Sequence, residues 1–325
     1  MKLIREGFNP MKFSVFKDKL VRKINESRLN SALEGYLNLD PVESNSNAEV
    51  TVMTQLYAKA IYMGVAAIHS LIRKLECSVN IEVIDDGSLT NEHHEILFNA
   101  FPGLTITKIE NIERYGCPAG GCWERLLRIQ ELTENYYVIQ VDTDILVVNE
   151  IPEINDCINA NSAFISSSPD WPKTVSIDEI VDYSSKSGSQ NIQFEAERQL
   201  SKITSIDLAH YVRGCAAFTG FPKGAGLTDK LSKFSQEMES ILGERWHEWG
   251  TEQFACNTMI ALCENLNVLP WPKYQNFCFP EFRPLIEGTN FNEEVAVIHF
   301  IGSNRFKYNV YLNYAKSLLN LLSNK

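Results

Sequence analysis

The sequence lacks any apolar run that could cross a membrane, because no segment approaches the roughly 20 consecutive apolar residues of a spanning helix. It also lacks the apolar stretch that would follow the early lysines in a signal peptide. Its eight cysteines form no C-x-x-C pair and are scattered through apolar sequence, which favours buried free thiols over zinc sites or disulfides. We therefore expect a soluble, cytoplasmic protein.

Positive charge is scarce, since 30 lysines and arginines face 41 acidic residues and the net charge is -11. This balance argues against a nucleic-acid partner. The N-terminus is the exception and is basic. Residues 12–24 predict an amphipathic helix with lysines on its polar face. Packing on the acidic body is the interpretation we favour, and peripheral contact with an anionic membrane through this basic helix stays open.

The chain has 325 residues, 44% of them hydrophobic, which is ample for a large core, and it contains no internal repeats. Residues 40–47 form a polar, turn-rich boundary, and residues 310–322 read as an amphipathic helix. We expect an N-terminal helical extension (residues 1–47), one α/β domain (48–309) and a C-terminal helix (310–325).

Within the domain, segments with strand character alternate with segments of helical periodicity. This alternation predicts βαβ units and a mostly parallel central sheet flanked by helices. The expected strands are 50–55, 79–84, 104–109, 136–141, 163–167, 216–218 and 295–300, and the expected helices are 63–75, 91–100, 123–132, 237–242 and 252–264. Residues 184–191 (SSKSGSQN) read as an exposed loop.

The strand at 136–141 is apolar at nearly every position and ends in Asp142-Thr143-Asp144, after which apolar residues resume. Two carboxylates between apolar segments are costly unless their charge is compensated. A divalent cation would compensate it, because hard cations prefer oxygen ligands. Ligands of open α/β sheets also bind at the carboxyl ends of the strands. A strand-end pair that only caps a turn is the alternative.

Further motifs occur in a recognisable order along the chain. They are Arg125 one helix upstream of the D-x-D, Glu252-Gln253, and His299-Phe300-Ile301-Gly302-Ser303-Asn304-Arg305. Together with the D-x-D they resemble nucleotide-sugar glycosyltransferases of the GT-A fold, and most closely glycosyltransferase family 8, the retaining enzymes related to glycogenin. The resemblance covers about residues 50–308. Two departures are visible: Glu252 and Phe254 replace the outer residues of the family's D-Q-D, and Arg305 replaces its lysine.

The resemblance implies a metal-dependent hexosyl transfer from a nucleotide sugar, a UDP-sugar by preference, to a saccharide, glycolipid or protein acceptor, with retention of configuration. It implies that Asp142, Asp144 and His299 hold Mn²⁺ or Mg²⁺. It implies catalytic roles for Glu252, Gln253 and Arg305, and acceptor contacts from residues 169–191 and 271–288. Implied donor contacts are Thr54, Gln55, Tyr57, Asp86, Arg125, Asp142, Asp144, Gly302 and Arg305.

Other interpretations compete with this one. A haloacid-dehalogenase-type phosphatase also has a D-x-D at a strand end, but near its chain start and usually followed by threonine. A nucleotide-sugar-binding protein without catalysis is the non-enzymatic alternative, supported by the incomplete D-Q-D. At single positions, His299 could be a core histidine and Gln253 an ordinary helix residue. Trp246 and Trp249 could stack on an acceptor sugar, although such pairs more often lie in a core.

Overall fold

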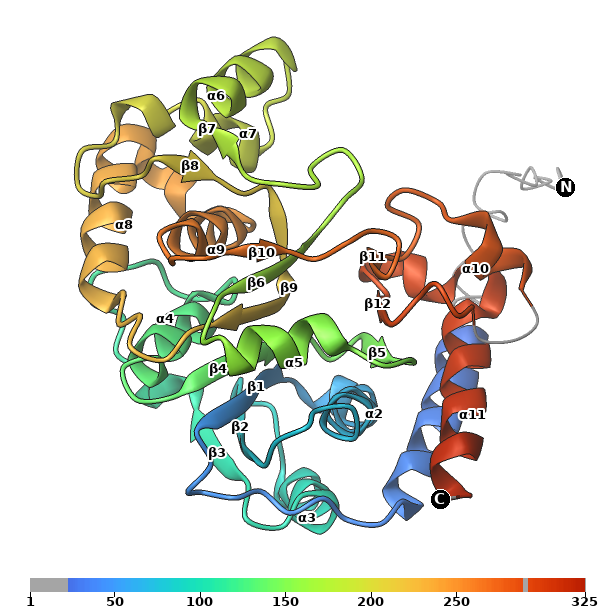
Figure 1. The fold of residues 1–325 in the computed structure, drawn as a ribbon. Helices are drawn as coiled ribbons and strands as arrows, with labels where there is room; N and C mark the ends of the chain where they lie inside the picture. The colour runs from blue at the N-terminus through green and yellow to red at the C-terminus, as the bar shows by residue number, and fades with distance from the viewer. Residues whose placement is uncertain (1–22, 289–291, 325) are drawn as a thin grey trace, which may run out of the picture.

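The computed structural model describes residues 23–288 and 292–324, and its centre is a seven-stranded sheet (Figure 1). The strand order is β10-β6-β9-β4-β1-β2-β3. Strand β9 runs antiparallel to both of its neighbours, and the other pairings in this sheet are parallel, as the sequence predicted. The strands are β1 (Val50–Leu56), β2 (Val79–Asp85), β3 (Thr105–Lys108), β4 (Tyr137–Val141), β6 (Phe164–Ser167), β9 (Gly214–Phe221) and β10 (Asn267–Val268).

Both faces of this sheet are covered, which explains why its central strands are apolar at nearly every position. Side chains alternate between two cores, because successive residues of a strand point to opposite faces. Val52 and its partner Ile139 belong to one core, and Met53 and Val138 belong to the other.

The two cores are built with different helices. The first core takes residues from α2 (Ile61–Ile72), α3 (Asn91–Ala100), α5 (Pro152–Asn159) and α11 (Val310–Ser323). The second takes residues from α4 (Trp123–Leu132), α8 (Thr228–Leu242) and α9 (Thr251–Ala261). The remaining helices are α6 (Ile177–Lys186), α7 (Ile192–Glu197) and α10 (Arg283–Glu287), and β7 (Val175–Ser176) pairs with β8 (His210–Tyr211).

A second, three-stranded sheet lies beside the end of β4. It has the order β11-β12-β5, where β5 (Ile145–Val147) follows the D-x-D directly. Strand β12 (Val297–His299) pairs antiparallel with β5 and parallel with β11 (Tyr274–Asn276). The sequence predicted the strand that carries His299, but assigned it to the main sheet, and that assignment is wrong. The reason is that the chain leaves the main sheet at the D-x-D turn and β5 provides the edge that β12 joins.

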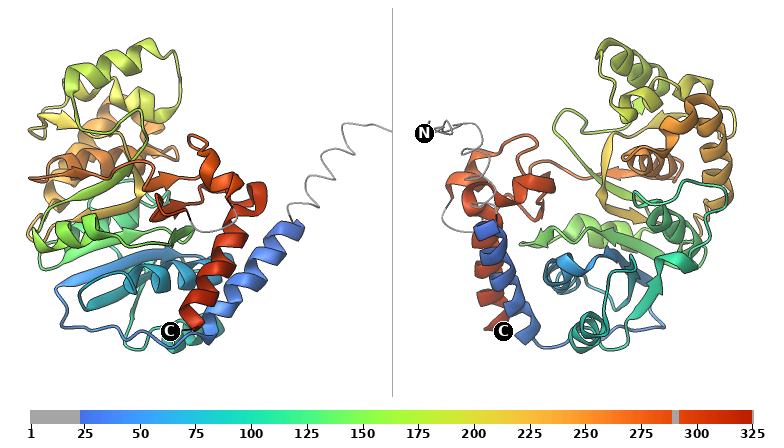
Figure 2. Two further views of the ribbon diagram at one scale, coloured as in Figure 1. Left: turned by 45° about the vertical axis from the view of Figure 1, so that its right-hand side comes forward. Right: turned by 180° about the vertical axis from the view of Figure 1, so that it is seen from behind.

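The first described helix, residues 23–34, lies beside α11 in both views of Figure 2. Leu29 and Leu33 belong to the same core as Leu318, and the Tyr36 hydroxyl donates to the Ala315 carbonyl (2.9 Å). The amphipathic helix predicted for residues 12–24 lies largely outside the described residues. The helix of residues 23–34 therefore packs against α11 at one side of the first core.

The prediction of an exposed loop at residues 184–191 is only partly right. Helix α6 continues to Lys186, and Ser184 is completely buried. Its hydroxyl donates to the buried Glu197 carboxylate (2.7 Å). The serine-rich composition predicts a loop, but it does not reveal the hydrogen bond by which Ser184 joins the end of α6 to Glu197.

All eight cysteines are free, three of them buried and five partly exposed. In the part of the chain that the structure describes, no helix combines the length and the apolar character that a membrane crossing requires.

Candidate active site

The D-x-D motif forms the turn that joins the two sheets. The amide of Asp142 donates to the Ala217 carbonyl of β9 (2.8 Å), and the amide of Ile145 donates back to the Asp142 carbonyl (3.3 Å). Asp142 is partly exposed, whereas Asp144 is buried. The turn therefore holds both carboxylates at the end of the buried strand β4.

Pairing of β12 with β5 brings His299 to this turn. His299 is in register with Ile145, and the amide of Phe300 donates to the Asp144 carbonyl (2.8 Å). The His299 Nε2 lies 3.3 Å from Asp144 Oδ1. One ligand atom from each of Asp142, Asp144 and His299 lies within 4.8 Å of the others.

The ring of His299 is oriented by its other nitrogen. His299 Nδ1 lies 2.7 Å from the Asn276 amide oxygen, with the Cys215 sulfur at 3.6 Å. Because an amide oxygen only accepts hydrogen bonds, Nδ1 carries the hydrogen and Nε2 faces Asp144. A second hydrogen bond of this kind is typical of metal-binding histidines.

Burial and charge act in opposite directions on this pair. Burial disfavours the charged form of His299, but the adjacent Asp144 raises the pKa of His299 well above its usual value. Burial likewise disfavours ionised Asp144, but His299 and Arg305 lower the pKa of Asp144 below its usual value. Without a metal, the two side chains form a buried ion pair.

Arg305 provides a second cation for Asp144. Its Nη2 donates to Asp144 Oδ2 (2.8 Å), and its Nε donates to the Gly302 carbonyl (2.7 Å). Both residues lie in the 3₁₀ segment η6 (Gly302–Asn309), which Gly302 enters with φ 53°, a left-handed conformation that glycine adopts without strain. The glycine thus lets the chain turn sharply after β12 and brings Arg305 back to the carboxylate.

Arg125 connects Asp142 to helix α9. Its guanidinium is buried, contacts Asp142 Oδ1 through Nη1, and donates through Nη2 to Glu252 Oε1 (3.0 Å). Burial raises the pKa of Glu252 above its usual value, although Arg125 acts in the opposite direction. Arg125 therefore holds Asp142 in place and compensates two carboxylates.

Gln253 joins α9 to β9. Its amide oxygen accepts from the Ala216 amide (3.0 Å), and its amide nitrogen donates to the Gly214 carbonyl and to Asn257 Oδ1 (both 3.0 Å). Both N–H groups of the side chain are thus in use. Its catalytic role stays a prediction.

These side chains line one cavity of about 500 Å³. Eight of the residues to which the resemblance assigns catalytic, donor or metal roles contribute to its wall: Arg125, Asp142, Asp144, Glu252, Gln253, His299, Gly302 and Arg305. Tyr57 lines a neighbouring hollow of about 240 Å³, which shares Gly302 and Arg305 with the cavity. The structure therefore brings most of the predicted residues together from distant parts of the chain.

Three predicted donor contacts line neither hollow. Thr54 is buried within β1, and Gln55 is the next residue of the same strand. Asp86 accepts hydrogen bonds from the amide (2.9 Å) and hydroxyl (2.6 Å) of Ser88 in the turn after β2. Their role in donor binding stays a prediction.

Sequence reasoning missed residues that complete the site. Asn276, which orients His299, stands 23 residues before it on a strand too short to recognise. Gln193 lines the cavity but belongs to no motif or predicted range, whereas Asn191 and Phe279, which also line it, fall within the ranges 169–191 and 271–288 expected to contact the acceptor. The tryptophan pair separates: Trp246 is buried in the second core, whereas Trp249 lines the cavity and is exposed.

The donor set fits a divalent cation. Two carboxylates and an imidazole nitrogen are suitable ligands for Mn²⁺, and Mg²⁺ would use mainly the carboxylates. The hydrogen bond from Nδ1 to Asn276 leaves Nε2 directed at the carboxylate that would share the ion. Asp142, Asp144 and His299 are therefore the residues that could hold a metal.

The sequence matches no protein-family model, and no curated protein sequence matches it. Solved structures do resemble the fold. The bifunctional glycosyltransferase WbbM in its apo form superposes with a TM-score of 0.54 at 15% identity, over 86% of this chain and 53% of that one. The chain thus spans about half the length of WbbM. The fold is that of the GT-A glycosyltransferases.

Two further structures resemble the chain at lower scores. One is the galactosyltransferase LgtC in complex with donor and acceptor sugar analogues, with 14% identity, coverage of 82% and 96%, and a TM-score of 0.48. The other is mouse xyloside xylosyltransferase 1 in its apo form, with 12% identity, coverage of 79% and 97%, and a TM-score of 0.43.

Proposed function

We propose that the protein is a metal-dependent glycosyltransferase that moves a sugar from a nucleoside-diphosphate sugar, by preference a UDP-sugar, to an acceptor. The observation that carries the proposal is the convergence of Asp142, Asp144 and His299 beside Arg305 in one cavity. A shared fold does not establish function, whereas a site of this chemistry gives direct support. The resemblance to family 8 adds that the anomeric configuration is retained.

The residues have distinct roles in this proposal. Asp142, Asp144 and His299 would hold a metal ion, which would supply Lewis-acid stabilisation of the negative charge on the donor diphosphate. Arg305 is a cation suited to bidentate contact with phosphate oxygens. Negative charge grows on the departing diphosphate during transfer, so a fixed cation there lowers the barrier. Arg125 acts as a positioning residue for Asp142.

The two hollows suggest how the donor lies. The hollow beside Tyr57 and the larger cavity meet at Gly302 and Arg305. A diphosphate at Arg305 would direct the nucleoside toward Tyr57 at the end of β1. The sugar would then extend into the larger cavity, where Glu252 and Gln253 lie. In this arrangement the base lies near Tyr57, the diphosphate near Arg305, and the sugar near Glu252 and Gln253.

The test is donor hydrolysis. Incubated with UDP-sugars and Mn²⁺, the protein should release UDP slowly, and a chelator should stop the reaction. Asp144→Asn keeps the shape and removes a metal-binding charge, so the rate should fall at least about 100-fold. Asp182→Asn, an exposed aspartate outside the cavity, is the matched control and should retain the rate.

The competing activities predict different products. A phosphatase would release phosphate from p-nitrophenyl phosphate, and a binding protein without catalysis would retain UDP-sugar unchanged. Either outcome, with a folded sample, would contradict the proposed function. Equal rates for Asp144→Asn and the unmodified protein would remove the metal site from the account.

A further inference from the structure

The rim of the cavity carries two unusually exposed aromatic residues. Trp249 is 84% exposed and Phe279 is 64% exposed, the two highest values among large hydrophobic residues of the described chain. Both line the same cavity as the D-x-D. Exposed apolar surface at the edge of a pocket is typical of ligand-binding sites. A purely structural reason is absent for Trp249, because its neighbour Trp246 already fills the core.

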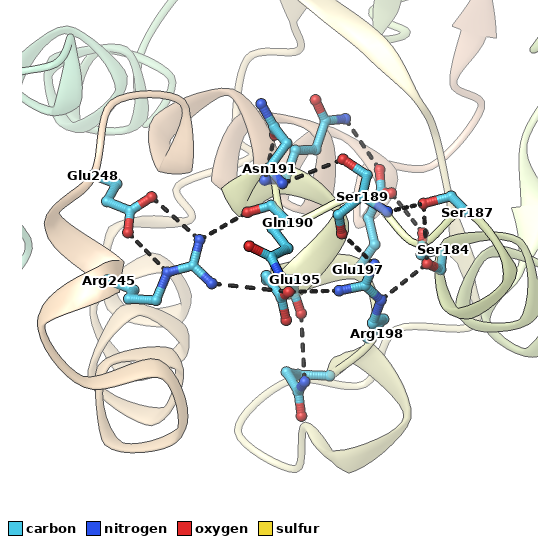
Figure 3. Close-up of polar contacts among 12 residues, drawn as sticks. Ser184, Ser187, Ser189, Gln190, Asn191, Glu195, Glu197, Arg198, Arg245 and Glu248 are labelled. Atoms are coloured by element: carbon cyan, nitrogen blue, oxygen red, sulfur yellow. Dashed lines mark hydrogen bonds and ion pairs between the residues drawn. The ribbon is translucent and has the colours of Figure 1, made fainter.

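Polar contacts hold the segment that presents Trp249. Arg245 donates to the Glu248 carboxylate (2.8 Å) and to the Gln190 carbonyl (2.9 Å), as Figure 3 shows. Arg198 donates to the carbonyls of Ser184 in α6 (2.9 Å) and of Ser189 in the loop that follows α6. The turn that carries Trp249 is therefore tied to the loop that leads to Asn191.

Two side-chain amides line the same cavity as the aromatic rings. Asn191 and Gln193 line the cavity, and Asn191 caps α7 by accepting from the Gln193 amide (2.9 Å). Side-chain amides offer donors and acceptors without net charge, which suits hydroxyl groups. Aromatic rings suit the C–H face of a sugar ring, because that face is apolar.

The charged groups of the cavity wall are paired with one another, and the rim residues themselves are uncharged. The basic side chains in its wall are Arg125, His299 and Arg305, and each lies against a carboxylate of the same wall. Arg245, just outside, is paired with Glu248. An anionic acceptor would therefore find no unpaired basic side chain among the residues that line the cavity.

We propose that this rim is the acceptor subsite and binds a neutral saccharide, with a sugar ring stacked on Trp249, Phe279 beside it, and hydroxyls facing Asn191 and Gln193. The inference rests on the proposed function and names its substrate class. Arg245 is a positioning residue, because it fixes the turn without lining the cavity.

Saturation-transfer NMR tests the subsite without any turnover. The probes are methyl β-galactoside, lactose and maltose as neutral saccharides and methyl β-glucuronide as the anionic counterpart, each with and without UDP and Mn²⁺. At least one neutral probe should bind, and Trp249→Ala should weaken its binding about tenfold. Trp249→Tyr should keep affinity within about threefold, because a flat ring remains. Phe98→Ala removes an exposed aromatic elsewhere, on α3, and should change nothing.

Three results would overturn the subsite: no binding of any neutral probe, equal affinity for Trp249→Ala and the unmodified protein, or tighter binding of the glucuronide. Thermal unfolding confirms that each variant is folded. Because Trp249 is exposed, its replacement should leave the unfolding temperature nearly unchanged. Donor hydrolysis is measured separately. Saccharide binding that depends on Trp249, without release of UDP, would contradict the proposed transferase activity and support the saccharide subsite. Release of UDP, with saccharide binding unaffected by Trp249→Ala, would support the transferase activity and contradict the subsite.

Discussion

Asp144 faces two cations, the imidazole of His299 at 3.3 Å and the guanidinium of Arg305 at 2.8 Å. A metal that binds the Nε2 of His299 must displace the proton there, because Asp144 raises the pKa of His299 and favours its protonated form. The same metal must compete with Arg305. Because His299 and Arg305 compensate the charge of Asp144, this buried carboxylate can remain ionised in the metal-free protein.

A second histidine, far from the site, gives a prediction on stability. His69 is buried in α2 against Phe101, and neither of its ring nitrogens has a partner in the described structure. Burial, with a contribution from Arg73, lowers the pKa of His69 from 6.5 to about 4. Between pH 6.5 and about pH 4, His69 is protonated in the unfolded chain but mostly neutral in the folded protein. The free energy of unfolding therefore falls as pH drops from 6.5 toward 4.

For this residue alone the loss between pH 7 and pH 5 is roughly 2 kcal/mol. Urea unfolding of the unmodified protein and of His69→Leu at both pH values isolates the contribution of His69, since all other groups titrate in both proteins. The variant should lose about 2 kcal/mol less than the unmodified protein. Equal losses in the two proteins would show that His69 is protonated without penalty in the folded state.

Single residues were predictable where a motif accompanied them. Asp142 and Asp144 stood out because charges interrupt an apolar run, and His299 because Gly302 and Arg305 follow it at fixed spacing. Asn276 carries no such signal, although it orients the histidine. Its role arises from the pairing of β11 with β12, in which Asn276 is in register with His299.

At the scale of elements, η6 is the segment whose state should depend on ligands. Its Arg305 is bound to Asp144 in the free protein, but in the proposed function the same cation serves the diphosphate. We expect the segment to close over the donor, as active-site loops often do. Arg305 would then exchange one anionic partner for another.

Replacing Arg305 with Gln tests this exchange by calorimetry. Mn²⁺ alone should bind the variant several-fold more tightly, because Asp144 loses a competing cation. UDP in the presence of Mn²⁺ should bind about tenfold more weakly, because a charge-assisted contact is lost. Arg283→Gln, an exposed arginine that pairs with Glu287, is the control. Weaker binding of both Mn²⁺ and UDP in Arg305→Gln would mean that Arg305 supports the metal site and does not compete with it.

Elements were predictable in proportion to their length and periodicity. Helices α3 and α4 begin and end where the sequence placed them. Helix α3 starts at a capping box formed by Thr90 and His93, and α4 carries a face of buried apolar residues. The strands of the second sheet are only three residues long, too short for a periodic signal, and their assembly depends on partners far along the chain. The position of Ser184 in α6 likewise involves a partner that local sequence does not reveal, the carboxylate of Glu197.

At the scale of the whole molecule, the site exists only in the complete fold. Asp142 and Asp144 lie between the two sheets, His299 lies on the small sheet, and Arg305 lies on the segment that leads to α11. The main sheet could be predicted because alternating strands and helices leave few topologies. The junction of two sheets could not, because it is decided by which edge a short strand joins.

The central claim is that Asp142, Asp144 and His299 bind one metal ion together with the diphosphate of the donor. Pulsed electron paramagnetic resonance of Mn²⁺ in the presence of UDP measures this directly. We predict two couplings in one spectrum, a ³¹P coupling from the diphosphate and a ¹⁴N coupling from a coordinated imidazole, with the ¹⁴N coupling lost in His299→Ala. A spectrum of Mn²⁺-UDP unchanged by the protein, or a ¹⁴N coupling that persists in His299→Ala, would contradict the account.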